Sequence, residues 1–497
     1  MSSRDEAPER NDGRQDGLAT YENVDRSYLA ERQLKKSAGW KLLWALGVGA
    51  VISGDFFGWN LGLEHGGFLG LVIATLAMAA MYLCMVFSIA ELSAALPHAG
   101  GFYSFVRSAL GPTAGYVCGV TDTIEYVLTP ATIVVTVAAT IEILIPGVHR
   151  YVWWLAAYGI FVAINIRGAQ LSLKLALGVT CVAILTLVVF YVAAPALGVF
   201  DWESLWNVKP RGAGTSTDLP GGWLGVFVAL PFATWFYLAI EQLPLAAEET
   251  HDVVRDMPRA LIFSIATLLG LSLLTLVLNT GVGGGADALK ASPSPLADGF
   301  KAVFGNGIVV KVLTVGILAG LIASFHAIIY AYGRVLFALS RAGYFPRWIS
   351  VTSRWQTPHR ALLVGTVAGL GYALLIDFAG SGAAQAALLV ASVAGAVISY
   401  VLVLASFIGL RWKRPELPRP YRSPLGVPGA AIGAVLAIVV FAACFAVVEY
   451  RLAMAGVIAL IAVALVYYFV HSRHRLVAQA PEELAALGGG DPMRHAP

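Results

Sequence analysis

Charged residues are scarce in this chain. Of its 497 residues, only 13% are charged and 58% are hydrophobic, whereas soluble domains usually carry about 25% charged residues. A soluble fold of this length could not bury so much apolar surface. The net charge of +3 gives no reason to expect a nucleic-acid partner. The composition therefore excludes an ordinary soluble protein and predicts a protein embedded in membrane lipid.

Cysteines and enzyme motifs are also scarce. The four cysteines lie inside apolar runs and none forms a CxxC pair, which argues against a metal site or a disulfide framework. They are Cys84, Cys118, Cys181 and Cys444. No HExxH, GxSxG or Walker A sequence is present. We therefore expect no enzyme, no catalytic residues, no cofactor and no transport driven by ATP.

Long apolar runs dominate the remainder. A bilayer span needs about 20 apolar residues, and about twelve such runs follow one another with short loops between them. They cover residues 40–63, 69–96, 113–145, 153–166, 171–199, 223–247, 260–282, 309–339, 362–379, 383–410, 427–448 and 452–470. The sequence therefore predicts an all-α polytopic membrane protein.

Basic residues are distributed unevenly between the two sides of these spans. If the N-terminus is cytoplasmic, most of the 33 lysines and arginines fall in the cytoplasmic tails and loops. Because such residues are retained on the cytoplasmic side, we expect both termini inside the cytoplasmic (inner) cell membrane.

Two spans contain sequence that interrupts a helix. In the first, glycines and Asp55 lie near the middle of the membrane, where an ionisable group is costly and suggests a function. Glycine lets a helix unwind and lets a ligand approach the backbone. In the sixth, Pro231 removes a backbone donor, aromatic residues follow around Tyr237, and Glu241 comes next.

These two spans begin the two five-span halves of the chain. That placement indicates a secondary transporter of a small polar solute, built from inverted repeats around a site at the membrane midplane. The alternative is two kinked helices that merely pack. A channel, a membrane sensor and a membrane enzyme are rival classes. Short loops, the lack of a sizeable soluble domain and the lack of a nucleophile–base or metal-ligand cluster count against them.

Polar tails flank the apolar region. Residues 1–37 carry mixed charges, almost no apolar run and no visible cleavable signal peptide. We expect a disordered cytoplasmic N-terminal tail over 1–37, a transporter domain over 38–475 and a cytoplasmic C-terminal tail over 476–497.

A few other polar residues lie inside spans. Asp122 and Glu125 are three residues apart in the third span, so they share one helical face. His326 in the eighth span is either a packed, hydrogen-bonded histidine or a proton relay. Glu241 is a candidate for coupling or gating.

Three further acids lie toward the cytoplasmic ends of spans. Glu91 closes the second span, where we expect a gate or a packing contact to a basic loop residue. Glu248 and Glu249 end the sixth span and are expected to meet cytoplasmic arginines.

Three motifs resemble those of a known superfamily. Residues 97–103 read Pro-His-Ala-Gly-Gly-Phe-Tyr and are similar to the P-x-A-G-G-x-Y signature of the amino acid–polyamine–organocation superfamily. Residues 333–346 and the stretch from 248 to 260 also resemble it. The likeness covers roughly residues 38–475. It implies two inverted five-helix repeats plus two further helices, with the first and sixth helices broken and alternating access around the breaks.

More narrowly, the chain resembles the ethanolamine permease branch of this superfamily. The likeness is carried by residues 53–60, 81–92 and 124–130. It implies uptake of ethanolamine, a small protonated amino alcohol, across the cytoplasmic membrane.

The first break departs from the pattern of amino acid carriers. In those carriers, backbone amides at the break bind the substrate carboxylate. Here the stretch reads Ser53-Gly54-Asp55, and a fixed carboxylate repels a substrate carboxylate but attracts an ammonium ion. We expect Asp55 or Glu125 to pair with the ammonium. Aromatic residues are expected to wall the site: Trp235, Phe236 and Tyr237.

The coupling ion stays open. Some proton-coupled relatives carry a lysine in the middle of the fifth helix, but residues 178–184 here contain none. Sodium coupling, a different proton carrier such as Glu125 or His326, exchange and uniport all remain. The nearest rival function is an amino acid or polyamine permease on the same fold.

Overall fold

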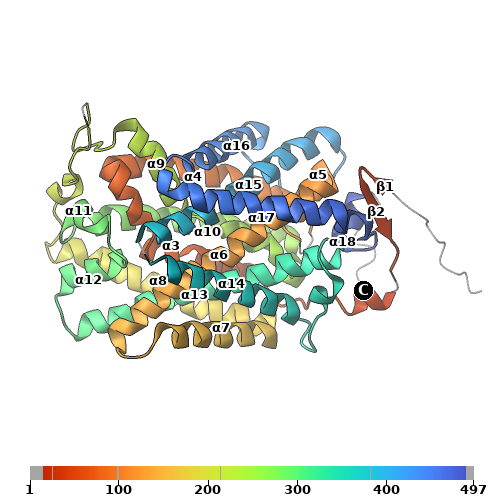
Figure 1. Cartoon of the computed structure of the whole chain (residues 1–497), viewed down its shortest axis with the longest axis horizontal. Helices are drawn as coiled ribbons and strands as arrows, with labels where there is room; N and C mark the ends of the chain where they lie inside the picture. Colours follow the sequence, from red (N-terminus) through yellow and green to blue (C-terminus); the bar gives the residue numbers. More distant parts are fainter. Residues whose placement is uncertain (1–14, 25, 98–99, 213, 381, 488–497) are drawn as a thin grey trace, which may run out of the picture.

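The computed structural model describes residues 15–24, 26–97, 100–212, 214–380 and 382–487, and most of them are helical. The long helices run roughly along one direction and pass between the two ends of a bundle (Figure 1). The described parts of both tails lie at one end, which we call the terminal end. The opposite end carries α11 (Gly285–Leu289) and α12 (Pro295–Phe304).

Nine helices of the described chain are long and apolar enough to cross a membrane. They are α4 (Leu63–Ala95), α6 (Pro112–Leu144), α8 (Ala169–Ala196), α10 (Val253–Thr280), α13 (Ile308–Arg341), α14 (His359–Ala379), α15 (Gly382–Lys413), α16 (Gly426–Ala443) and α17 (Arg451–Val470).

Three further segments match predicted spans. They are α7 (Arg150–Arg167), the interrupted series α2 (Trp40–Val51), α3 (Ser53–Phe56) and η1 (Trp59–Gly62), and the interrupted pair α9 (Gly222–Thr234) and η3 (Ile240–Glu249). The predicted all-α polytopic membrane fold is confirmed.

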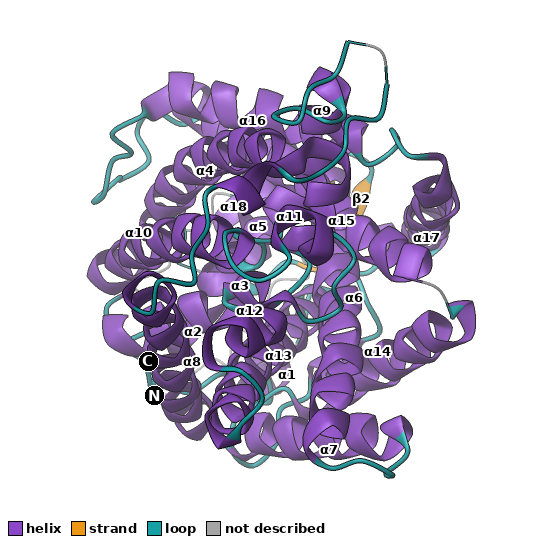
Figure 2. Ribbon diagram, turned by 90° about the vertical axis from the view of Figure 1, so that its left-hand side faces the viewer, coloured by secondary structure: helices purple, strands orange, loops and turns teal. Residues whose placement is uncertain are grey.

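The middle of the bundle is formed by α6 and α15. In each, 83% of the most apolar window is buried inside the protein, compared with 17% in α17. Viewed toward one end of the bundle, α3 lies near the middle while α7, α10, α14 and α17 lie at the rim (Figure 2). The first break is therefore surrounded by protein, and α17 presents most of its surface outward, where lipid is expected.

The first span is interrupted twice. Ile52 separates α2 from α3, and the helix then stops at Phe57, which is extended with φ −160° and ψ 167°. Gly58 follows with φ 93°, a conformation that glycine adopts without a steric penalty. Among the glycines of the first span, Gly58 is therefore the one at which the helix unwinds, whereas Gly54 lies inside α3.

The sixth span is interrupted between α9 and η3. Ala239 has a left-handed backbone with φ 81° just before η3 begins. A residue other than glycine in this conformation is strained and needs support from its surroundings. The second half then continues as a 3₁₀ helix that contains Pro244, whose missing amide cannot support regular α-helical bonding.

The described part of the N-terminal tail does not show the predicted disorder, and the described part of the C-terminal tail also contains regular elements. Residues 15–37 include β1 (Gln15–Asp16), β2 (Ala19–Glu22) and α1 (Arg26–Ala30), and β2 pairs in parallel with β3 (Leu476–Val477) of the other tail. α18 (Pro481–Ala486) follows β3. Polar composition suggested disorder, but the polar groups are paired: Glu482 and Glu483 are fully buried against arginines. Residues 1–14 and 488–497 lie outside the described part.

Short helices connect these elements. They are α5 (Phe102–Leu110), η2 (Glu203–Trp206), η4 (Arg347–Ser350), η5 (Val448–Tyr450) and η6 (Ser472–His474). Two residues of the 97–103 motif, at 98 and 99, lie outside the described part, and the motif leads directly into α5.

Candidate functional site

The two interrupted spans touch each other at their breaks. A Cβ atom added to Gly54 would lie 2.3 Å from the carbonyl oxygen of Trp235. The rings of Phe57 and Trp235 meet edge to face with centroids 5.8 Å apart, and those of Trp59 and Phe236 stack at 5.6 Å. All of these side chains are buried. The predicted aromatic residues therefore line the contact between the first and sixth spans.

Three backbone amides at the first break are already engaged. The Ser53 amide donates to the Ser324 hydroxyl at 2.9 Å. The Asp55 amide donates to the carbonyl of Ile52 at 3.1 Å, and the Phe57 amide donates to that of Ser53 at 3.1 Å. A substrate carboxylate that used these donors would have to displace existing hydrogen bonds. These three amides are therefore not available to an anion in this arrangement.

Asp55 faces protein instead of lipid. Its carboxylate is buried and accepts a 3.0 Å hydrogen bond from the Thr275 hydroxyl on α10. The Tyr191 hydroxyl of α8 lies 2.6 Å from the same Thr275 oxygen. Tyr237, held by a 2.9 Å hydrogen bond to Ser272, lies within electrostatic range of Asp55. The second oxygen of Asp55, Oδ2, has no hydrogen-bond partner among the described residues.

A second acidic group lies between α6, α15 and η3. Glu125 and Asp122 project from α6, Glu241 comes from η3, and all three side chains are buried. Glu241 Oε1 accepts hydrogen bonds from the Ala239 amide at 3.0 Å and from the Tyr400 hydroxyl at 2.7 Å. The first of these bonds supports the strained backbone of Ala239. Glu125 interacts directly with Glu241, and Asp122 lies within electrostatic range of both.

The two acidic centres are separate. Within the described chain, no hydrogen bond or electrostatic contact links Asp55 to Glu125 or Glu241. Tyr82 lies between them, because its ring is 5.4 Å from that of Tyr237 and its hydroxyl is 2.9 Å from that of Tyr400. The sequence analysis named Asp55 and Glu125 as alternative partners of one ammonium ion, whereas the structure places these two acids in different surroundings.

None of these four acids has a basic partner in the described chain. The ion pairs found there involve neither Asp55, Asp122, Glu125 nor Glu241. An unpaired charge in a dry interior is strongly unfavourable, so such groups are neutralised by protons or by a bound cation.

The acids at the terminal end are paired instead. Glu249 accepts a 2.8 Å bond from Arg334, and Glu248 accepts from Arg341 at 2.5 Å. The expectation that Glu248 and Glu249 meet arginines is confirmed. Arg341 also reaches Glu482 of α18 at 2.5 Å, so one guanidinium joins α13, the sixth span and the C-terminal tail.

Glu91 is a packing contact to basic groups, one of its two predicted roles. Arg411 donates to both of its carboxylate oxygens, at 3.0 and 2.6 Å, and the Ser423 amide donates at 2.7 Å. Arg419 approaches to 3.2 Å. Glu91 thereby ties the end of α4 to the connection between α15 and α16, away from the two breaks.

His326 joins three helices. The Asn165 side-chain nitrogen lies 3.2 Å from its Nδ1, and the Ser172 hydroxyl lies 3.0 Å from its Nε2. Both ring nitrogens are thus in contact with neutral groups of α7 and α8. This arrangement is the packed, hydrogen-bonded alternative of the sequence analysis, and it places His326 apart from the acidic centres.

Several site residues were missed by sequence reasoning. They are ordinary hydroxyl side chains inside apolar runs: Tyr82, Tyr191, Thr275, Ser324 and Tyr400. The signal that the sequence offered for these residues was a polar side chain inside an apolar span. That signal is weak, because hydroxyls in spans often bond to their own helix, as Thr136 does.

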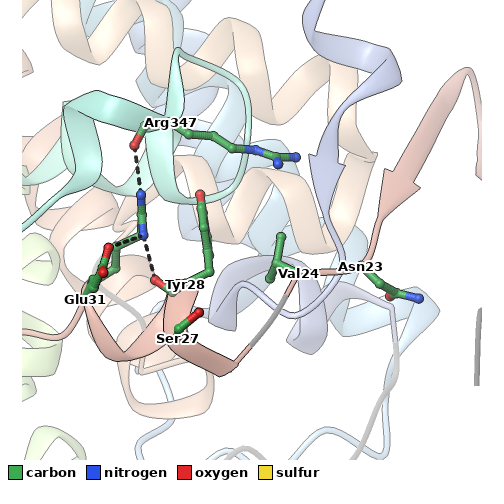
Figure 3. Close-up of a pocket in the computed structure, with 7 residues that line it drawn as sticks. Asn23, Val24, Ser27, Tyr28, Glu31 and Arg347 are labelled. Carbon is green, nitrogen blue, oxygen red and sulfur yellow. Dashed lines mark hydrogen bonds and ion pairs between the residues drawn. The ribbon is translucent and has the colours of Figure 1, made fainter. Parts of the chain in front are cut away.

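A pocket of about 410 Å³ opens at the terminal end, far from the breaks in sequence and in position (Figure 3). Asn23, Val24, Tyr28 and Arg347 are among its lining residues, and Arg32 donates a 2.8 Å hydrogen bond to the Tyr28 carbonyl. The pocket lies against the N-terminal tail and is mostly polar. In the described part of the chain, no three His, Cys, Asp or Glu side chains are grouped to hold a metal ion.

Comparison with known proteins identifies the family. The family model described as amino acid permease matches residues 42–477. The chain belongs to the amino acid permease family. Three relatives span most of this permease. An uncharacterized transporter of Rhizobium meliloti is 27% identical over 77% of this chain and 81% of its own length.

Two relatives have named substrates. The branched-chain amino acid permease of Bacillus subtilis is 27% identical over 89% of this permease and 94% of its own length. The L-asparagine permease of Streptomyces coelicolor is 25% identical over 88% of this permease and 90% of its own length. Membership confirms the superfamily resemblance and a multi-pass membrane transporter of small molecules. The ethanolamine branch and the site residues stay predictions.

Proposed function

We propose that this permease takes up a small protonated amine that lacks a carboxylate, with ethanolamine as the leading candidate. Transport proceeds by alternating access around the breaks of the first and sixth spans, in the cytoplasmic membrane with both termini inside. The observation that carries the proposal is the set of four buried acids that have no basic partner among the described residues: Asp55, Asp122, Glu125 and Glu241.

Charge complementarity favours a cation at the first break. A carboxylate-bearing substrate would meet the fixed charge of Asp55, and like charges in contact inside a poorly polarisable site repel strongly. It would also find the amides of Ser53, Asp55 and Phe57 occupied. An ammonium ion needs acceptors only, since it has three donors.

Asp55 is the proposed partner of the ammonium. Its Oδ2 atom is an acceptor without a described donor, while Oδ1 is fixed by Thr275. Tyr191 and Tyr237 are close enough to Asp55 to offer hydroxyls or ring faces to a two-carbon amino alcohol. Ser53 and Gly54 complete the proposed site through the backbone, because Gly54 brings Trp235 into contact with the break.

Amino acid transport is the second candidate. It is favoured by the relatives named as permeases for branched-chain amino acids and L-asparagine. A zwitterionic substrate needs a site for its carboxylate as well as for its ammonium. In this permease, that requires the breaks to separate and the amide of Ser53 to leave Ser324.

Uptake into proteoliposomes tests the proposal. Radiolabelled ethanolamine is offered with unlabelled ethanolamine, alanine or putrescine as competitors, and we expect ethanolamine to compete best. Asp55→Asn and Glu125→Gln are compared with Glu142→Gln, which removes an exposed acid from the same helix as Glu125. If alanine competes better than ethanolamine, the amino acid alternative holds. If Asp55→Asn and Glu125→Gln both retain wild-type uptake, the site assignment is wrong.

A further inference from the structure

We propose that Glu125 and Glu241 share one proton and form the proton-coupling site of this permease, separate from Asp55. The assignment of Asp55 to the ammonium rests on the function proposed above. Glu125 thereby moves from the substrate-binding group to the coupling group, and Glu241 becomes its partner.

The first step is the contact between the two carboxyl groups. The side chains of Glu125 and Glu241 lie within hydrogen-bonding reach of each other, and no other donor in the described chain reaches either oxygen of Glu125 or Oε2 of Glu241. Carboxylates only accept hydrogen bonds, so a bond between two carboxyl groups requires a proton on one of them. If both were ionised, like charges would be in contact inside the protein, where repulsion is strongest.

The second step assigns the proton to Glu125. Glu241 Oε1 already accepts from the Ala239 amide and the Tyr400 hydroxyl, which stabilise it as a carboxylate. Neither oxygen of Glu125 receives a bond from an amide, a hydroxyl or a base in the described chain. A protonated Glu125 that donates to Glu241 satisfies both groups, whereas the reverse arrangement leaves Glu125 as a carboxylate without those donors.

The third step is the absence of a competing base. From α6, Asp122 acts on the pair electrostatically, and the phenol of Tyr126 lies in range of it. From α4 and α15, the facing titratable groups are the phenols of Tyr82 and Tyr400. None of these groups brings positive charge, so the described surroundings leave the pair to be neutralised by the proton.

The last step links the proton to movement. Glu241 holds the strained Ala239 backbone at the break of the sixth span, and Glu125 projects from α6, whose most apolar window is 83% buried. Loss of the shared proton turns an attractive contact between these elements into a repulsive one. We expect the closed arrangement to form only with a proton on the pair and an ammonium at Asp55. Each cycle then carries two positive charges inward, because the amine keeps its own proton.

Two transport measurements and one spectroscopic measurement test this site. Counterflow exchange of labelled ethanolamine needs no ion gradient, whereas accumulation against a gradient needs coupling. For Glu125→Gln, which leaves the support of Ala239 by Glu241 in place, we expect counterflow within about threefold of wild type. We expect at least a tenfold loss of accumulation driven by a pH gradient. Glu142→Gln should behave as wild type in both measurements.

Infrared spectroscopy reads the shared proton without any substrate. Near neutral pH, the difference spectrum between wild type and Glu125→Gln should contain a buried protonated-carboxyl band that is absent from the difference spectrum between wild type and Glu142→Gln, because the bands of Asp55 and Asp122 are common to all three proteins and cancel. The proton site is overturned if the first difference spectrum lacks this band, if Glu125→Gln still accumulates the amine on a pH gradient, or if wild-type accumulation follows sodium alone. Absence of ethanolamine counterflow in wild type would refute the amine function instead, and the infrared result would still decide the proton site.

Discussion

Tyr400 and Glu241 are joined by a 2.7 Å hydrogen bond that links α15 to the second half of the broken sixth span. The Tyr400 hydroxyl also lies 2.9 Å from that of Tyr82 on α4. Hydrogen bonds therefore connect three structural elements in series, from Tyr82 through Tyr400 to Glu241. The same carboxylate supports the backbone at Ala239, so its hydrogen bonds and the shape of the break depend on each other.

Tyr400→Phe should weaken proton-driven uptake without unfolding the protein. Hydrogen bonds to charged groups contribute about 1.5–3 kcal/mol, which corresponds to roughly tenfold or more in rate or affinity. The control is Tyr332→Phe, which removes a buried hydroxyl bonded to Thr366 on α14. Equal uptake by both variants at every pH would contradict the role of Tyr400.

Gly54→Ala should abolish transport. The added Cβ atom would lie 2.3 Å from the Trp235 carbonyl oxygen, which is a backbone atom and cannot rotate away. Relief requires the two breaks to move apart, and such overpacking costs about 1–3 kcal/mol. Gly178→Ala is the matched control, because no atom lies within 4 Å of its added Cβ. Uptake normalised to the amount of folded protein should fall at least tenfold only in Gly54→Ala, and wild-type uptake by that variant would count against contact between the breaks.

The membrane fold could be predicted because span length and apolar composition are local properties of the sequence. A break in the sixth span was also predicted, but Pro231, which suggested it, lies inside α9, and the irregular backbone comes later, at Ala239. The tails were misjudged, since the partners of Glu482 and Glu483 are arginines far away in the chain. Composition reports how polar a segment is, but it carries no information about which distant group pairs with it.

The candidate site could be predicted only in part for a similar reason. Asp55, Glu125 and Glu241 stand out as acids inside spans, and their burial agrees with that signal. Their division into two centres depends on how α6, α10 and η3 pack, which no single span encodes. The hydroxyl partners Thr275 and Tyr400 have no distinguishing local pattern, so only the folded chain brings them to the acids.

Thr275→Val should raise the KM for the amine by roughly tenfold. Valine keeps the shape of threonine but removes the hydroxyl that donates to Asp55 at 3.0 Å. A buried acceptor that loses its donor costs about 1–3 kcal/mol, so Asp55 becomes a poorer carboxylate partner for an ammonium ion. Thr275→Ser keeps the hydroxyl and should retain near-normal uptake. The measurement is the initial rate of uptake at a series of amine concentrations for both variants. If Thr275→Ser and Thr275→Val raise the KM equally, the Thr275 hydroxyl does not have this role.

Breaking the buried ion pair between Arg107 and Glu483 should destabilise the terminal end. Arg107 Nε lies 2.6 Å from the Glu483 carboxylate, with side chains 2% and 0% exposed, so a buried ion pair joins α5 to α18. Removing one partner of a buried pair typically costs about 3–5 kcal/mol, because the other charge stays buried. Glu483→Gln should therefore lower the temperature at which detergent-purified protein loses its monodisperse peak.

Two control experiments test whether the loss of stability is specific to the Arg107–Glu483 pair or follows from the removal of any charged side chain. Glu64→Gln removes a partner of Arg211 from an ion pair that is 45% and 41% exposed, and exposed pairs contribute only about 0–1 kcal/mol. Arg107→Leu combined with Glu483→Leu leaves no uncompensated charge between these two residues, so it should be less damaging than Arg107→Leu alone. If Glu483→Gln and Glu64→Gln shift the melting temperature equally, the tails are not fastened by this pair. The parallel pairing of β2 with β3 would then be the main contact between them.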